Sequence, residues 1–227
     1  MKFSDIKQKI AIDLKKNIPE NVVELPYLKR KAVYRPMKNR EMKEFLKAFE
    51  KKDEFLISAA FDAIIESCLH SIDGESIDAK DLCTPDRQYL LLKIRQASLG
   101  DIAKIYHAVE NRPDPIELEV DLNSFAVVYK NEVVRNEIEI TENVKMVLGL
   151  ATRRDELEME AWLKKSANKN SIIDRSYSSA ATLIKEVYIK TEDGEWENVS
   201  INFFEKVQLL SDVCTPNTFK EIKELSQ

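Results

Sequence analysis

Glycine is scarce in this sequence, and its scarcity excludes a class of binding sites. Four glycines occur among 227 residues, whereas about 16 would be typical of a chain of this length. No two of them lie closer than 26 positions apart. A phosphate-binding loop and a dinucleotide fingerprint each need two or three glycines within about six residues. The chain therefore holds neither of these nucleotide-binding motifs.

Cysteine and histidine are also sparse. The chain has three cysteines and two histidines, which are Cys68, Cys83, Cys214, His70 and His107. An odd count at wide spacing argues against a disulfide framework, and no pair has the C-x-x-C or H-x-x-x-H spacing that is typical of metal sites. We therefore expect reduced thiols, no metal, no cofactor, no small-molecule substrate and no enzymatic activity.

Long apolar runs and an excess of positive charge are missing too. No stretch reaches the roughly 18 consecutive apolar residues of a membrane helix, and the first five residues lead into no apolar signal-peptide region. The net charge is -5 and the pI about 5.4, so the chain lacks the overall basic character of a nucleic-acid-binding protein. We expect no membrane partner and a cytoplasmic protein.

One segment departs from this acidic balance. Residues 29–43 contain seven basic residues, and Tyr27 and Tyr34 lie before and within them. Basic side chains interleaved with aromatic rings are typical of nucleic-acid surfaces. The same pattern suits a charged surface ahead of a helix, which we favour, or a contact with an acidic protein partner. Nucleic acid is the least favoured of the three interpretations.

Apolar residues recur at helical spacing in the first half of the chain. Extended segments are predicted at 22–26 and 32–36, because each ends before or at a proline. Helices are predicted over residues 1–18, from Asn39 through Phe49, over 54–70, and from Thr84 to near Gly100, with a further helical turn or two over 101–109.

The second half shows more alternation. Ile116, Leu118, Val120 and Leu122 alternate with polar residues, as in a half-buried strand, and further alternation predicts one small antiparallel sheet over about 116–150. A glycine-containing turn at Glu192–Glu195 predicts a hairpin over about 184–201. Helices are predicted from Thr152 through Leu163, over 202–212 and over 215–225, and residues 166–182 are predicted as a loop, a weak helix or both.

These elements predict an α+β fold that is predominantly helical. It would have a helical N-terminal part, a small antiparallel sheet in the middle, and a C-terminal hairpin with helices. The predicted domain organisation is an N-terminal helix with an extended lead-in over 1–24, a helical domain over 25–112, and a mixed part over 113–227.

Two stretches carry a resemblance to a known family. The first is Tyr34-Arg35-Pro36-Met37 leading into Asn39-Arg40-Glu41-Met42-Lys43, and the second is the helix within Leu82–Gly100. The second stretch resembles the best-marked part of the baseplate hub and hub-assembly proteins of T-even-type contractile-tailed phages. The chain departs from that family at Tyr106–Val109, which hold no cysteine, so no zinc site is expected.

The resemblance implies a structural or assembly protein of the baseplate hub that acts through protein–protein contacts. Its partners would be other baseplate hub or tail proteins, with the tape measure protein as a candidate. It would reside in the host cytoplasm during assembly and, in one version, in the tail baseplate of the virion. The alternatives are a chaperone-like factor absent from the finished virion, and a nucleic-acid-associated phage protein that uses residues 29–43.

Eight residues are the candidates for a protein interface or for the family motif. In Arg95 and Ser98, which share a helix face, we favour a role in tying the helix end to the sheet over a contact with a partner. We also expect residues 29–43 and 166–182 to lie at a protein interface. The eight candidates are Tyr34, Arg35, Arg40, Asp86, Tyr89, Arg95, Ser98 and Gly100.

Overall fold

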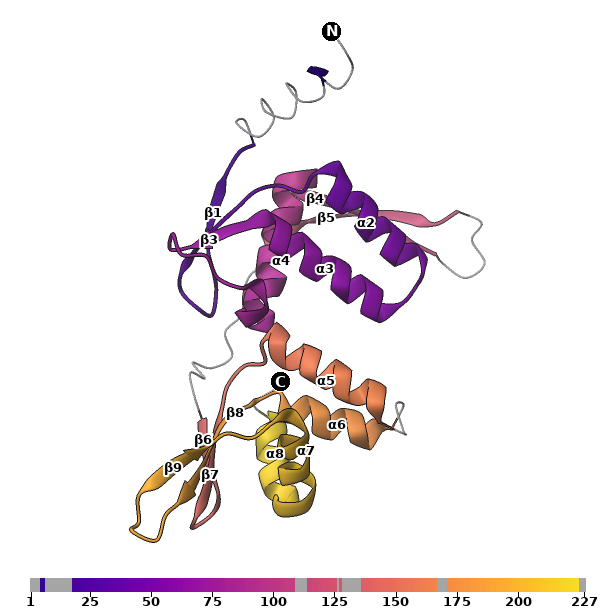
Figure 1. The fold of residues 1–227 in the computed structure, drawn as a ribbon. Helices are drawn as coiled ribbons and strands as arrows, with labels where there is room; N and C mark the ends of the chain where they lie inside the picture. Colours follow the sequence, from indigo (N-terminus) through magenta and orange to yellow (C-terminus); the bar gives the residue numbers. More distant parts are fainter. Residues whose placement is uncertain are drawn as a thin grey trace. The chain divides into compact units, whose positions relative to one another are not determined.

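A computed structural model describes residues 5–6, 18–108, 114–125, 127, 136–166 and 171–224 (Figure 1). The chain divides into two compact units. Unit 1 comprises residues 1–79 and 85–128, and unit 2 comprises residues 80–84 and 129–227. The domain boundaries predicted from the sequence remain a prediction.

Unit 1 contains a three-stranded antiparallel sheet and three long helices. The strands are β1 (Asn21–Glu24), β2 (Lys31–Tyr34) and β3 (Leu69–Ile72), in the order β1-β2-β3. The helices are α2 (Asn39–Glu50), α3 (Glu54–Cys68) and α4 (Thr84–Leu99). The N-cap Asp53 accepts the backbone N–H groups of Phe55 and Leu56 at 2.9 and 3.1 Å, which satisfies two donors at the start of α3.

Helix α4 leads into a separate two-stranded ribbon. Gly100 has a φ of +86° and its N–H donates to the carbonyl of Gln96 at 2.9 Å, so it ends the helix in the left-handed conformation that favours glycine. Strand β4 (Ile102–His107) follows and pairs antiparallel with β5 (Ile116–Asp121). The short turn η2 (Leu122–Ser124) closes this part.

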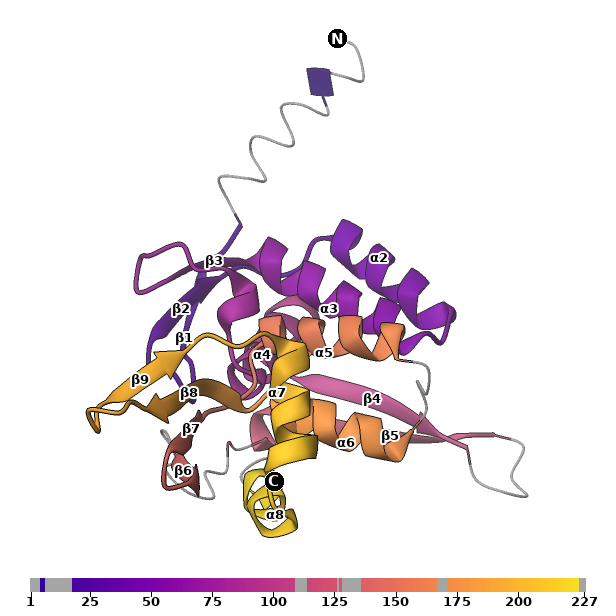
Figure 2. The ribbon, with the colours of Figure 1, turned by 60° about the horizontal axis from the view of Figure 1, so that its bottom comes forward.

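Unit 2 has a four-stranded antiparallel sheet, and its helices lie against one face of that sheet (Figures 1 and 2). The strands follow the order β6 (Asn136–Thr141), β7 (Val144–Leu148), β8 (Ile184–Lys190) and β9 (Trp196–Val199). The helical elements are α5 (Arg153–Lys165), α6 (Ile172–Ala181), α7 (Phe203–Gln208), the π-helical turn η3 (Leu209–Val213) and α8 (Pro216–Glu224).

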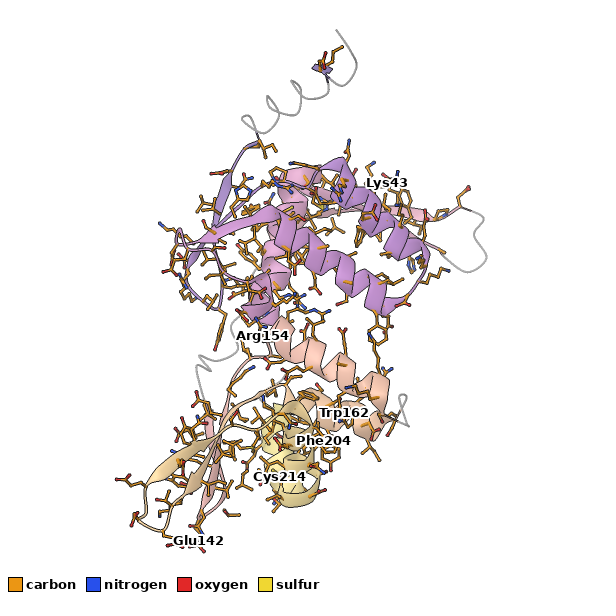
Figure 3. The ribbon with its side chains drawn as sticks, viewed as in Figure 1. Lys43, Glu142, Arg154, Trp162, Phe204 and Cys214 are labelled. Atoms are coloured by element: carbon orange, nitrogen blue, oxygen red, sulfur yellow. The ribbon has the colours of Figure 1, made fainter. Side chains whose placement is uncertain are left out.

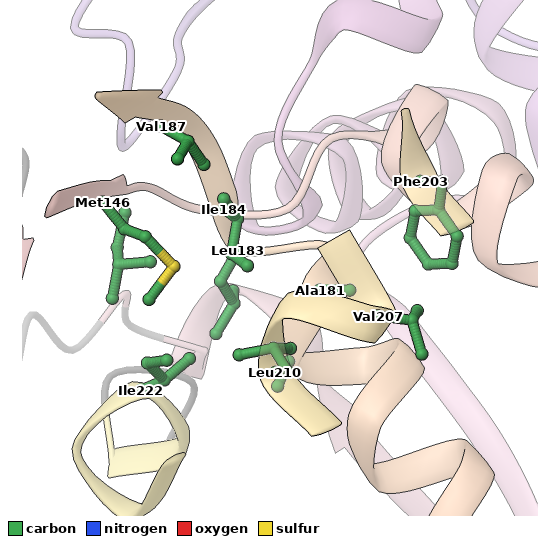
Figure 4. Close-up of a cluster of buried hydrophobic side chains, with 11 residues drawn as sticks. Met146, Ala181, Leu183, Ile184, Val187, Phe203, Val207, Leu210 and Ile222 are labelled. Atoms are coloured by element: carbon green, nitrogen blue, oxygen red, sulfur yellow. The ribbon is translucent and has the colours of Figure 1, made fainter. Parts of the chain in front are cut away.

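The core of unit 2 lies between this sheet and its helices. Met146, Ile184 and Val187 extend from the strands toward Leu210 and Ile222 of the helices (Figure 4). Burying one such side chain contributes about 1.5–3 kcal/mol. Met146 and Leu148 of β7 are two positions apart, whereas Ile184 and Val187 of β8 are three apart because the register of the two strands shifts between them.

Residues 80–84, with the short helix η1 (Ala79–Asp81) at their start, belong to unit 2 by their contacts. The Thr84 hydroxyl donates to Glu156 at 2.6 Å, and the carbonyl of Leu82 accepts the N–H of Arg153 at 3.2 Å. Arg153 is almost fully buried and forms ion pairs with Glu156 and Glu160 at 3.3 and 2.6 Å. A segment from the middle of the sequence thus completes the packing of α5.

The predicted fold class, α+β and predominantly helical, is wrong in its weight on helices, because the fold is a mixed α+β one. Of the described residues, 49% are helical and 25% lie in strands, and the strands form three antiparallel sheets. The N-terminal part is not simply helical, because β1, β2 and β3 form a sheet within it. The strands predicted over 116–150 do not form one sheet, because β5 pairs with β4 whereas β6 and β7 join the hairpin of β8 and β9.

Individual elements had different outcomes. The helix that begins at Thr84, the helix capped by Thr152 and the hairpin of β8 and β9 are confirmed. The helical turns predicted over 101–109 are wrong, because Ile102–His107 form β4. Residues 166–182 contain α6. The helix predicted over 1–18 lies largely outside the described residues.

Candidate protein-interaction site

The start of α4 is anchored by Asp86, the first acidic residue of the family motif. Asp86 is completely buried, and its carboxylate accepts the backbone N–H groups of Tyr27 at 2.7 Å and Leu28 at 3.1 Å. These amides belong to the turn between β1 and β2. A buried carboxylate that binds two backbone donors fixes the turn against the helix.

Tyr34 and Tyr89 lie near each other on β2 and α4. Tyr34 is buried, and burial raises its pKa, with a smaller contribution from the neighbouring Tyr89. Tyr89 is half-buried, and the Nζ of Lys93 lies 5.3 Å from the centre of its ring. Both tyrosines therefore form part of the packing between β2 and α4.

Arg35 is also internal. It is buried, and its guanidinium donates to the carbonyl of Pro36 at 2.8 Å and to Glu41 at 2.9 Å. Burial alone would raise the pKa of Glu41, but hydrogen bonds from Arg35 and from the backbone N–H of Lys38 bring that pKa below its usual value. Arg40, by contrast, is exposed on the first turn of α2.

The last turn of α4 holds three further candidates. The hydroxyl of Ser98 accepts the backbone N–H of Met37 at 2.8 Å. The guanidinium of Arg95 donates to the carbonyl of Gly100 and, at 3.1 Å, to that of Ile102. Arg95 therefore connects the end of α4 to the start of β4, and Ser98 connects it to the loop before α2.

These contacts bring the two stretches of the family motif together inside unit 1. Ser98 binds Met37 of the first stretch and Tyr89 lies near Tyr34 of that stretch, whereas Asp86 holds the turn that precedes β2. Arg35 stabilises the loop between β2 and α2. Of the eight candidates, Arg40 and Gly100 are the exposed residues. A role at a protein interface for these residues stays a prediction.

The basic segment 29–43 is divided between internal and external side chains. Arg30 forms ion pairs with Asp73 and Glu75, both at 2.8 Å, and Arg35 is buried as described. The five basic residues that remain exposed are Lys29, Lys31, Lys38, Arg40 and Lys43, the last of which lies on α2 (Figure 3). A continuous seven-residue basic surface is therefore not formed, which weakens the nucleic-acid interpretation.

Large apolar side chains are exposed on unit 1. On the helical hairpin, Phe49 is 61% exposed, although its neighbour Phe45 stacks on Phe61 with ring centres 5.1 Å apart. On the ribbon, Ile105 and Leu118 lie opposite each other and are 50% and 49% exposed. The sequence did not indicate the exposed position of Ile105, because residues 101–109 were predicted as helical.

Unit 2 exposes apolar side chains at two places. Ile172 is 84% exposed at the start of α6 and its neighbour Ile173 is 65% exposed. Phe204 on α7 is exposed as well (Figure 3). The residues of α6 fall within the segment 166–182 that was predicted to lie at an interface, and that role stays a prediction.

Two other kinds of site are not found. Among the residues that the structure describes, no three His, Cys, Asp or Glu side chains gather where they could hold a metal ion. Within the same residues, no helix is both long and apolar enough to span a membrane. Burial raises the pKa of Cys68 to about 11, so this thiol stays protonated.

Adjacent exposed apolar side chains are more informative than single ones, and the register of the ribbon places Ile105 directly opposite Leu118. The model of one protein family, described as T4 bacteriophage base plate protein, matches residues 18–227. The chain belongs to this family, and the resemblance to T4-type baseplate proteins is confirmed. No curated protein and no solved structure gives a match to the chain.

Proposed function

We propose that this protein is a non-enzymatic structural or assembly protein of the baseplate hub, which acts by binding other tail proteins. The observation that carries the proposal is the set of large apolar side chains exposed on both units of a baseplate-family chain. Phe49, Leu118 and Ile172 are the clearest of them. Adjacent apolar side chains are costly to leave in water. Ile105 and Leu118, which lie opposite each other on the ribbon, are therefore the place where a covering partner is most expected.

Assignment to the hub rests on the second motif stretch. Residues 82–100 resemble the hub and hub-assembly proteins most closely, and they form the helix that organises unit 1 through Asp86 and Ser98. The hydrogen bonds within the motif account for its polar residues by a structural role, so no catalytic role is needed to explain them. They leave α2, α3 and the ribbon of β4 and β5 to meet partners, with the tape measure protein as a candidate.

Two versions of the function differ in where the protein ends up. In one it is a stoichiometric subunit of the virion, and in the other it is a chaperone-like factor that leaves the finished tail. A charged fraction of 33% and a scarcity of glycine suit a protein that also exists free, which favours the second version slightly.

Quantitative mass spectrometry of purified phage particles and of infected-cell lysate separates the versions. A fixed copy ratio to other baseplate proteins in the particles supports the subunit. Abundance in the lysate together with absence from the particles supports the assembly factor. Absence of any association with tail proteins in both samples contradicts the proposed function.

A further inference from the structure

Strand β5 has two chemically different faces. Its sequence alternates Ile116, Leu118 and Val120 with Glu117, Glu119 and Asp121. Because successive side chains of a strand point to opposite faces, the three apolar residues lie on one face and the three carboxylates on the other. The register places Ala103 opposite Val120 and Ile105 opposite Leu118, so the apolar face continues across β4.

The carboxylate face is only partly neutralised. Lys104 on β4 contacts Glu117 at 2.5 Å and Glu119 at 3.5 Å, and Asp121 accepts the N–H of Asn123 at 2.9 Å. One lysine therefore serves two glutamates, and both glutamates remain exposed. This face carries an excess of negative charge.

Strand β5 lies at one edge of the ribbon, and the apolar face of the ribbon is partly exposed. Within the residues that the structure describes, β5 pairs with β4 and with no other strand, so its second edge offers backbone donors and acceptors. A two-stranded ribbon is marginally stable by itself in water. On the apolar face of β5, Ile116 and Val120 are half-buried and Leu118 between them is exposed.

Strand β6 of unit 2 has a sequence pattern similar to that of β5. It also alternates glutamates with apolar residues and also lies at the edge of its sheet. Its apolar residues Ile138 and Ile140, however, pack against the core of unit 2. In β5, by contrast, Leu118 of the same pattern is 49% exposed.

We propose that the free edge of β5 docks an extended segment of another tail protein in which apolar and basic residues alternate. A strand added to this edge places its side chains beside those of β5 on the same two faces. Its apolar residues would extend the face of Ile105 and Leu118, and its lysines or arginines would lie beside Glu117 and Glu119. Roughly six residues, about 20 Å of strand, would match β5.

A second copy of this chain is a poorer occupant. If β5 paired with β5 of another molecule, glutamates would lie beside glutamates, and like charges in neighbouring positions destabilise a sheet. The charge of β5 therefore favours a partner strand of the opposite sign. The inference rests on the proposed function only for the origin of the partner in the tail.

Two synthetic peptides test the docking strand on the full chain. Both have the same alternating valines, and one has lysine where the other has glutamate. Binding is measured by fluorescence anisotropy, and hydrogen exchange reports protection of the amides of residues 116–121. We expect the lysine peptide to bind about tenfold more tightly, since two cross-strand ion pairs replace two like-charge pairs, and to protect β5.

A charge swap provides the decisive variant. Lys104→Glu combined with Glu117→Lys and Glu119→Lys keeps the ion pairs within the ribbon but reverses their sign, and it should reverse the preference to the glutamate peptide. The matched control is Glu137→Lys with Glu139→Lys on β6, which should leave the preference for the lysine peptide unchanged. Circular dichroism verifies that each variant is folded.

Three results would overturn the docking strand. The first is equal affinity for the lysine and glutamate peptides. The second is protection of the amides of β6 or β9 in place of those of β5. The third is a folded charge-swap variant that still prefers the lysine peptide. Self-association that protects residues 116–121 without peptide would make a second copy the occupant, against the proposal. If the peptides behave as expected but particles and lysate show no tail association, the docking strand stands and the proposed function fails.

Discussion

Replacing Asp86 tests whether the family motif is an internal anchor. In Asp86→Ala the carboxylate that accepts the N–H groups of Tyr27 and Leu28, at 2.7 and 3.1 Å, is lost from a fully buried position. Hydrogen bonds to a charged acceptor contribute about 1.5–3 kcal/mol each. Two such bonds set the scale of the expected change.

The expected loss of unfolding free energy is about 3–5 kcal/mol, because two hydrogen bonds to a charged acceptor are lost and both amides are left without that acceptor in a partly buried site. Asp86→Asn keeps one acceptor oxygen but turns an NH2 group toward the second amide. Its expected loss is about 2 kcal/mol. Both values are large beside the total stability of a typical domain, which is about 5–15 kcal/mol.

Urea denaturation followed by circular dichroism measures the free energy, and hydrogen exchange measures protection at residues 26–29. The control is Gln88→Ala, an exposed position on the same helix, which should change stability by about 0.5 kcal/mol or less. The anchoring role is refuted if Asp86→Ala matches this control and the amides of Tyr27 and Leu28 keep their protection.

Three further predictions follow from single contacts. Ser98→Ala should lower the free energy of unfolding by about 1–2 kcal/mol in urea denaturation, because the backbone N–H of Met37 loses its acceptor at 2.8 Å. The amide of Met37 should then exchange faster, and an unchanged exchange rate would contradict this prediction. Burial alone would raise the pKa of Asp155, but hydrogen bonds from Lys185 and Thr152 bring that pKa below its usual value. The ionised carboxylate therefore stabilises the folded protein above about pH 4, and this contribution is lost as the pH falls through the lowered pKa. Acid titration of the unfolding free energy should show the loss in the wild type and not in Asp155→Asn. Cys68, with its pKa raised by burial to about 11, should resist iodoacetamide at pH 8 in the folded protein and react in urea, as mass spectrometry would show; rapid labelling of the folded protein contradicts the buried site.

The elements that the sequence predicted well have local signals. Thr84 with the following proline, Thr152 with Asp155 three residues later, and the glycine turn at Gly194 each specify an end or a turn by short-range hydrogen bonds or a backbone preference. Such signals depend on neighbours in the sequence and not on the rest of the fold.

The elements that were missed depend on partners far away in the chain. Strand β3 continues directly from α3, without a glycine or proline between them, and forms because β2 lies beside it. Strand β4 follows the stop at Gly100, and its large apolar residues Ile102, Ile105 and Tyr106 stand at positions i, i+3 and i+4, a spacing that indicates a helix. Which strands share a sheet is decided by tertiary pairing, so a single sheet over 116–150 was the wrong grouping.

The candidate residues show the same division. Their identity came from a resemblance between stretches of sequence, whereas the contact of Asp86 with the turn after β1 joins residues 59 positions apart. No local pattern indicates that pairing. The exposure of Ile105 and Leu118 also required the register of β4 and β5.

Cross-linking mass spectrometry of baseplate assembly intermediates tests the central claim most directly. Lys43 on α2 and Lys104 on the ribbon supply reactive amines on exposed parts of unit 1. If this protein works by binding other tail proteins, both lysines should cross-link to baseplate hub or tail proteins in intermediates isolated from infected cells. Intermediates that contain the protein but yield cross-links only within its own chain, or intermediates that lack the protein altogether, would contradict that claim.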